Sequence, residues 1–355
     1  MTSPILFLVI CFSLVFNGLC RTSFPSKQES KIIKTKYGVY DCVDFYKQPA
    51  FNHPLLKHHT SKVLPKKIEE FQRQKVNGFG LKDGCPIGTV PILRTNPNSH
   101  WGEDPPPPEP KLVAGVQTSE DSSRNFLGVS GTLLIYKPTV NDFGQYSSAR
   151  IKLLNGKDSV EAGYLVNPKV FNDFEAHLYV SFEVGGSKLG SVNLQCFGFV
   201  QVDKDVPLGF PPTHYSVIGG QQWSWDLSIQ KDIIDKNWWV FIASAPIGYW
   251  PNEIFDTLVD GANQVEWGGE VYDFGLKNPP SPLPEMGSGV KGSYQSSAAA
   301  IYHATYLDDN YINRTNPERT NTIANCDPDY VVVDNGYIND AFGRVIHFGG
   351  VRDEN

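Results

Sequence analysis

Short apolar runs separated by turn residues recur along most of the chain. Within them apolar and polar residues alternate with a period of two, which is the pattern of a half-buried β-strand. Runs of this kind lie at residues 131–138, 177–186, 196–203, 237–250 and 343–350. One stretch, residues 251–263, predicts a short helix. Many short strands predict an all-β protein, folded as a sandwich or a barrel.

One predicted strand, VEWGGEVYDF at residues 265–274, carries two carboxylates on a single face. Because strand side chains alternate, Glu266, Gly268 and Glu270 share that face, and the opposite face is apolar. A strand otherwise suited to a protein core therefore presents Glu270 beside a missing side chain.

A second predicted strand, residues 159–166, repeats this arrangement with Glu161 and Gly163. A glutamate flanked by glycine on its own face would lie at the floor of a cleft, and Glu161 facing Glu270 would form an acid/base pair. One carboxylate would polarise a water while the other, protonated, would donate to the substrate. Close like charges would raise one of the two pKa values. The alternative is that each glutamate lies on the solvated face of an edge strand.

Length, composition and charge limit the classes of protein to which this chain can belong. A chain of 355 residues forms one large or two modest domains. The net charge of −7 gives no electrostatic support for a nucleic-acid partner. The counts of 32 Gly, 26 Pro and 44 aromatic residues (7 Trp, 16 Tyr and 21 Phe) favour a turn-rich β protein.

The first twenty residues predict a signal peptide. An apolar run at residues 5–16 precedes Gly18-Leu19-Cys20, which places small residues at the −3 and −1 positions of a cleavage site. The run is short for a bilayer, although a membrane anchor is the alternative. We therefore expect a secreted protein with no membrane partner.

Cysteine usage fits an oxidising compartment. Cys42, Cys85, Cys196 and Cys326 remain after the signal peptide, and four cysteines allow three connectivities. Their spacing and the scattered histidines predict no metal site, and we expect no cofactor. Asn313 begins the one glycosylation sequon, Asn313-Arg314-Thr315.

Charge and proline content divide the chain. Residues 21–75 are rich in lysine, with an amphipathic helix predicted at 65–75, and the remainder is acidic. EDPPPPEP at residues 103–110 predicts a stiff, protease-accessible boundary. A basic front and an acidic body suggest an intramolecular partner; a solvated tail is the alternative.

Several motifs together resemble the neprosin family of secreted plant proteins. YDCVDFYKQPAFNHPLLKHH (residues 40–59) and GCPIGTVPILRT (84–95) are similar to the family's N-terminal activation domain. EAGYLVNP, CFGFVQ, GYWPNEIF, WGGEV and MGSG follow the landmarks of its C-terminal neprosin domain in order. The resemblance covers nearly the whole mature chain.

The resemblance implies a glutamic peptidase made as a zymogen. Residues 21–100 would form a small pro-domain that docks over the cleft and inhibits its own chain, and residues 101–355 a catalytic antiparallel β-sandwich acting on polypeptides. Glu161 and Glu270 would be the catalytic pair, active at acid pH and cleaving beside proline. Glu266 would be a bystander.

Further expectations come from the positions where the chain matches or departs from the family pattern. Tyr164, Tyr249 and Trp250 are expected to bind substrate. Tyr164 replaces a tryptophan, and Ser181-Phe182 replaces a Tyr-Trp pair, which predicts a weaker preference for proline than in relatives.

The cysteine pattern also departs from the family. Cys42 and Cys85 both lie in the activation segment and are expected to pair there. Cys196 lacks its usual partner, so Cys196 and Cys326 are expected to be free or bonded to each other.

Other activities remain open at this stage. A β-sandwich that has lost catalysis could serve as an extracellular binding module, using aromatic side chains such as Tyr249 and Trp250. A glycoside hydrolase also uses two carboxylates. No G-x-S-x-G, P-loop or HExxH motif is present.

Overall fold

The computed structural model describes residues 31–60, 79–94, 111–120, 123–185, 191–194, 197–273, 281–293, 297–324 and 328–352. Five features of the sequence analysis lie outside these residues: the signal peptide, the helix at 65–75, the proline-rich segment, Cys196 and Cys326. None of the described helices is long and apolar enough to cross a membrane.

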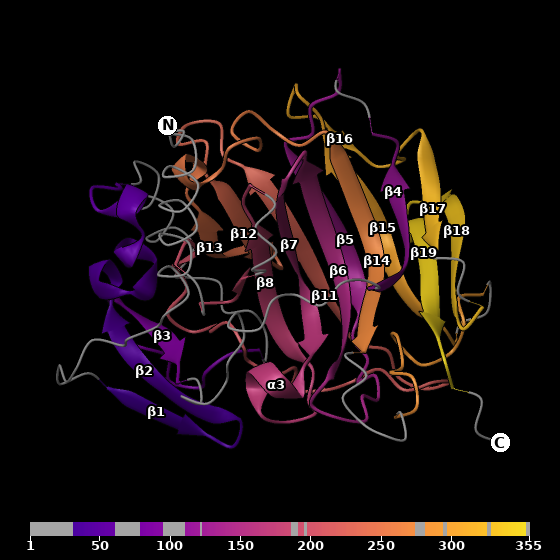
Figure 1. The fold of residues 1–355 in the computed structure, drawn as a ribbon, viewed down its shortest axis with the longest axis horizontal. Coiled ribbons are helices and arrows are strands. Elements are labelled where there is room, and N and C mark those ends of the chain that lie inside the picture. Colours follow the sequence, from indigo (N-terminus) through magenta and orange to yellow (C-terminus); the bar gives the residue numbers. More distant parts are fainter. Residues whose placement is uncertain are drawn as a thin grey trace, which may run out of the picture.

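The chain is an antiparallel β-sandwich preceded by a small separate sheet (Figure 1). The predicted fold class is therefore confirmed. Nine strands form one large sheet and seven form the other, and three N-terminal strands form the small one.

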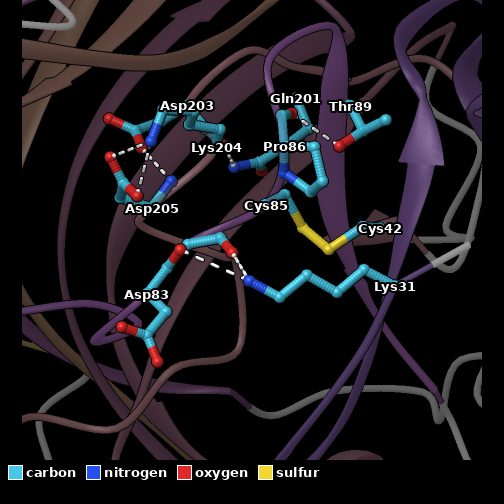
Figure 2. The surroundings of a disulfide bond; sticks show 11 residues. Lys31, Cys42, Asp83, Cys85, Pro86, Thr89, Gln201, Asp203, Lys204 and Asp205 are labelled. Carbon is cyan, nitrogen blue, oxygen red and sulfur yellow. Dashed lines mark hydrogen bonds and ion pairs between the residues drawn. A yellow bond between two sulfur atoms is a disulfide. The ribbon is translucent and has the colours of Figure 1, made fainter.

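The small sheet has the order β1-β2-β3 and includes three 3₁₀ turns between β2 and β3. Its elements are β1 (Ile32–Thr35), β2 (Gly38–Asp44), η1 (Phe45–Lys47), η2 (Pro49–Asn52), η3 (Pro54–Leu56) and β3 (Thr89–Leu93). A disulfide joins Cys42 of β2 to Cys85, as expected (Figure 2).

The seven-stranded sheet has the order β17-β4-β14-β6-β7-β8-β9. Its strands are β4 (Leu112–Thr118), β6 (Gln145–Asn155), β7 (Asp158–Val166), β8 (His177–Glu183), β9 (Ser191–Val192), β14 (Gln264–Asp273) and β17 (Thr320–Ala324). The two segments that carry the candidate glutamates, β7 and β14, are thus strands, and β6 lies between them.

The nine-stranded sheet has the order β10-β13-β12-β11-β5-β15-β19-β18, with β16 paired to β15. Its strands are β5 (Gly128–Leu134), β10 (Val200–Gln201), β11 (Ser224–Lys231), β12 (Trp238–Ile242), β13 (Ala245–Trp250), β15 (Ala299–Leu307), β16 (Asn313–Arg314), β18 (Tyr330–Asn339) and β19 (Gly343–Gly350).

The main core lies between the two large sheets. From the seven-stranded sheet, Ile151 and Trp267 are fully buried in it, and Ile229 and Ile346 of the other sheet belong to the same cluster. Period-two alternation explains this burial, because the alternate residues of β6, β7 and β14 point away from the core.

The helix predicted at residues 251–263 is mostly absent. Only η4 (Asn252–Ile254) forms, and the one described α-helix, α3 (Pro168–Phe171), lies elsewhere. The physical reason is a long-range contact: the carboxylate of Asp158 accepts hydrogen bonds from the backbone N–H groups of Asp256, Thr257 and Leu258. These donors are satisfied without helical hydrogen bonds.

The N-terminal unit, whose described residues are 31–60 and 79–94, packs against the edge of the nine-stranded sheet at β10 and β13. Phe45, Val90 and Ile92 share an apolar cluster with Trp239 and Tyr249. Figure 1 shows the small sheet, with β1 and β2 in indigo and β3 in purple, beside the sandwich at this end.

Polar contacts complete this interface. The Gln48 side chain accepts from the backbone N–H of Gln201 and donates to its carbonyl. The backbone N–H of Cys85 donates to the carbonyl of Lys204, beside the disulfide (Figure 2). The unit is therefore attached to the sandwich by apolar packing and by strand-like hydrogen bonds.

Candidate active site

A pocket opens on the face of the seven-stranded sheet that points away from the core. Its lining residues come from β6, β7, β8, β9 and β14, from the residue before β4 and from the residue after β7. They are Lys111, Tyr146, Ser148, Lys152, Ser159, Glu161, Leu165, Asn167, Tyr179, Ser181, Glu183, Val192 and Glu270. Both glutamates that the sequence analysis selected line this pocket.

Strand register brings the two glutamates to the same place. Arg150 of β6 is the Cα partner of Gly268 on one side and of Gly163 on the other. Glu270 and Glu161 each lie two residues from one of these glycines, on the same strand face. The glycines leave both positions beside Arg150 without a side chain.

Both glycines are also required by the backbone. A Cβ on Gly163 would lie 1.9 Å from the carbonyl oxygen of Ala149. A Cβ on Gly268, whose φ is +153°, would lie 2.4 Å from the carbonyl oxygen of Ala114. Strands β4, β6, β7 and β14 can pair in this register only where these side chains are missing.

Arg150 fills the resulting space and contacts three carboxylates. Its Nη2 donates to Oε2 of Glu270 at 3.1 Å, and its Nη1 donates to Oε2 of Glu266 at 2.9 Å. Its Nε lies 3.4 Å from Oε2 of Glu161, an ion pair without a hydrogen bond. The Arg150 side chain is 3% exposed, so it lies beneath the carboxylates.

Two tyrosines hold the other oxygens of the pair. The hydroxyl of Tyr146 donates to Oε1 of Glu270 at 2.6 Å, and the hydroxyl of Tyr179 donates to Oε1 of Glu161 at 3.2 Å. Burial is the largest cause that raises the pKa of both phenols well above the usual value, and the nearby carboxylates raise it further. The two phenols therefore stay protonated and act as donors.

Two lysines add positive charge to the pocket. Lys111 Nζ lies 3.5 Å from Oε1 of Glu270, and Lys152 Nζ lies 3.5 Å from Oε2 of Glu161. Burial alone would raise the pKa of Glu270, but Lys111, Arg150, Lys152 and the Tyr146 hydroxyl together hold that pKa well below its usual range. The rise in pKa that like charge was expected to cause in one member of the pair is therefore not found at Glu270, because cations surround this carboxylate.

Two features of the site escaped the sequence analysis. Arg150 was not selected, although it stands in mid-strand on the polar face of β6, between Ser148 and Lys152. Glu266 was expected to be a bystander, but its side chain is 12% exposed and bonded to Arg150. A charged residue in the middle of a strand with alternating apolar and polar positions is the feature of the sequence that would have indicated Arg150.

The aromatic residues expected to bind substrate do not line the pocket. Tyr164 and Trp250 are fully buried in the main core, and Tyr249 lies beneath the N-terminal unit, where His59 contacts its hydroxyl. The alternation of strand faces explains the error for Tyr164, which lies on the core side of β7. Ser181 does line the pocket, whereas its neighbour Phe182 packs in the core.

The N-terminal unit lies away from the pocket. Among the described residues 31–60 and 79–94, none lines it, and the expected docking over the cleft is not seen for this part of the segment. One basic group of the unit does meet an acidic group of the body, since His59 Nδ1 lies 3.1 Å from Oε1 of Glu253.

The fold and the site define a two-part chain, in which a disulfide-bonded N-terminal unit is attached to an antiparallel sandwich with a carboxylate-lined pocket. The chain belongs to the neprosin family. The family model described as Neprosin matches residues 143–351, and the model described as Neprosin activation peptide matches residues 32–99.

Solved structures of two peptidases are similar to this chain. Scytalido-glutamic peptidase with a peptide-based transition-state analogue is 11% identical, with a TM-score of 0.36; the match covers 68% of this chain and 99% of that one. SCP-B, a member of the Eqolisin family of peptidases in complex with the tripeptide Ala-Ile-His, is 10% identical, with a TM-score of 0.38 and the same two coverages.

Proposed function

We propose that this protein is a secreted, acid-active glutamic endopeptidase made as a zymogen, with Glu161 and Glu270 as its catalytic pair. The observation that carries the proposal is the convergence of the two carboxylates on one guanidinium in an open pocket. Each carboxylate has its second oxygen held by a tyrosine hydroxyl. The membership of the neprosin family and the matched activation peptide support it.

The chemistry needs one carboxylate and one carboxylic acid. The ionised glutamate takes a proton from water as the water oxygen bonds to the scissile carbonyl carbon, and the protonated glutamate supplies a proton to the leaving amine as the C–N bond breaks. Because the cations around the pair favour two carboxylates, the one proton that the pair needs arrives only in acid. The proposed acid activity follows from this requirement.

The substrate would enter beside an apolar wall. Leu165 and Val192 line the pocket together with the rings of Tyr146 and Tyr179. Proline has a rigid ring and no N–H group, so a site that prefers it needs apolar contact more than a backbone acceptor. We propose cleavage beside proline with a modest preference, since Ser181 adds no ring to this wall.

Secretion and glycosylation are part of the same proposal. The N-terminal apolar run supports export, and a formed Cys42–Cys85 disulfide suits an oxidising compartment. Asn313 lies exposed on β16, where a glycan would be accommodated.

The proposal is tested by incubating the purified chain at pH 3 to 7 with a denatured proline-rich protein and identifying fragments by mass spectrometry. We expect fragments at acid pH, ending beside proline in excess over other residues. Their absence at every pH, also after cleavage of the segment between the two units, would contradict the proposal.

A second candidate is a binding module without catalysis. The observation that favours it is Arg150 itself, which pairs with Glu161, Glu266 and Glu270 and could hold all of them ionised. A binding module would retain peptides in equilibrium dialysis at acid pH and return them intact.

A further inference from the structure

The rung of the sheet that contains Arg150 is unusual in its side chains. Gly268, Arg150 and Gly163 are consecutive Cα partners across β14, β6 and β7. Two residues along the strands, Glu266 and Glu161 on one side and Glu270 on the other point to the same face as Arg150. The guanidinium is therefore the one side chain on its rung among these three strands, and three carboxylates surround it.

The contacts on Arg150 are divided among the carboxylates. Each of its three nitrogens faces a different glutamate, at 2.9 Å, 3.1 Å and 3.4 Å. Since a guanidinium stays charged under all conditions of interest, a carboxylate in contact with it is favoured as the ion. Glu266 competes with Glu161 and Glu270 for the positive charge of Arg150, and its own negative charge repels both carboxylates.

We propose that Arg150 is a positioning residue that holds Glu161 and Glu270 against one shared cation and thereby sets the pH at which the pair takes up its catalytic proton, with Glu266 opposing it. This inference rests on the proposed peptidase function. It assigns roles to Arg150 and Glu266 that the glutamate pair alone does not require.

Other charged and titratable groups also face the pair. They are Lys111 before β4, Tyr146 and Lys152 on β6, Tyr179 and Glu183 on β8, and Glu266 on β14. Lys111 and Lys152 act in the same direction as Arg150, at longer distances of 3.5 Å. Replacing Arg150 alone therefore weakens the positive field without abolishing it.

The pH profile of peptide hydrolysis separates this role from a structural one. Activity is lost on the alkaline side as the required proton leaves, so the alkaline limb reports the pKa of the pair. Arg150→Gln removes a cation and should move that limb up by about one pH unit or more. Glu266→Gln removes an anion and should move it down, while Arg150→Lys, which keeps the charge, should move it less than Arg150→Gln.

Opposite movement of the limb in Arg150→Gln and Glu266→Gln is the expected result. Variants that lose activity with the limb unmoved would overturn the proposal and leave the peptidase function standing. If Arg150→Gln does not fold, the downward shift in Glu266→Gln and the near-parental limb in Arg150→Lys are the test.

A second readout does not depend on activity. In the parent, the surrounding cations favour the ionised form of Glu270 and lower its pKa. The stability that this ionised group contributes is therefore constant at neutral pH. It is lost only as the pH falls below the pKa of the unfolded chain, about 4.3. In Arg150→Gln, Lys111 and Lys152 still lower the pKa of Glu270, but by less, so the variant loses less stability than the parent as pH falls below about 4.3. The difference in Tm between the two proteins should therefore narrow between about pH 5 and about pH 2.

A difference in Tm that stays constant from about pH 5 to about pH 2 would overturn the assignment of Arg150. If no protein hydrolyses peptide but the Tm difference narrows as expected, the peptidase function fails, whereas the control of the two carboxylates by Arg150 stands.

Discussion

The hydroxyl of Tyr146 donates a hydrogen bond to Oε1 of Glu270, 2.6 Å away on the neighbouring strand. The other oxygen of the same carboxylate, Oε2, accepts a hydrogen bond from Nη2 of Arg150 at 3.1 Å. Glu270 is thus fixed from two sides by groups on β6, and its carboxylate plane is determined by the pairing of β6 with β14.

Removing the Tyr146 hydroxyl should impair catalysis more than folding. A hydrogen bond to a charged group contributes about 1.5–3 kcal/mol, so Tyr146→Phe should lower kcat/KM by roughly 10- to 100-fold. The control is Tyr136→Phe, because the Tyr136 hydroxyl donates to Gln222 at 2.8 Å and does not line the pocket. An equal loss of activity in both variants would contradict a specific role for Tyr146.

Ser181 should control the preference for the residue next to the cleaved bond. Ser181→Tyr places a ring in the pocket beside Glu161, its Cα partner, and should strengthen the preference for proline by about 10-fold or more. Phe182→Trp is the matched control, since Phe182 packs in the core and should change Tm instead. A peptide library digested at acid pH measures both; an unchanged cleavage pattern in Ser181→Tyr would contradict this role.

The fold was largely predictable because alternation determines which strand face is buried. The segments at 159–166 and 265–274 are strands, with the glutamates on the face away from the core, as the period of two required. The helix predicted at 251–263 was wrong, since the decisive hydrogen-bond acceptor, Asp158, lies about a hundred residues away in the sequence.

The site was predictable only within single strands. Glycine two residues from Glu161 and from Glu270 indicated a cleft, but the pairing of β6 between β7 and β14 is a long-range feature, and Arg150 enters the site through it. Tyr249 and Trp250 were misplaced for the same reason: both belong to β13 of the other sheet, and Tyr249 lies beneath the N-terminal unit.

Acid should weaken one contact between the N-terminal unit and the sandwich. The hydrogen bond from His59, the largest cause, holds the pKa of Glu253 below its usual value. The resulting stability is present above the unfolded pKa of about 4.3 and is lost as pH falls through the folded pKa. Glu253 is half exposed, so the effect should be below about 1 kcal/mol.

The measurement for this contact is the urea midpoint of the chain at pH 6 and pH 3. Glu253→Gln should lower the midpoint at pH 6 and leave it unchanged at pH 3. Glu318→Gln, at an exposed loop position, is the control and should have no effect at either pH. A deficit of the same size in Glu253→Gln at both pH values would contradict the assignment.

The Cys42–Cys85 disulfide should stabilise the N-terminal unit. It joins residues 43 positions apart, and closing a loop of this size contributes about 4 kcal/mol by the chain-entropy estimate. The double variant Cys42→Ala/Cys85→Ala should lose protease resistance in residues 31–94 at a lower urea concentration than in the sandwich. Simultaneous loss in both parts, at the parental urea concentration, would show that the disulfide contributes little.

The central claim is that Glu161 and Glu270 together hydrolyse peptide bonds. The most direct test is kcat/KM at acid pH on a proline-containing peptide for Glu161→Gln and Glu270→Gln. Glu285→Gln is the matched control, because Glu285 is a buried carboxylate paired with Arg352 at 2.9 Å outside the pocket. We expect losses of about 100-fold or more in each of the first two variants, with the fold retained, and near-parental activity in the control. Parental activity in either Glu161→Gln or Glu270→Gln would contradict this claim.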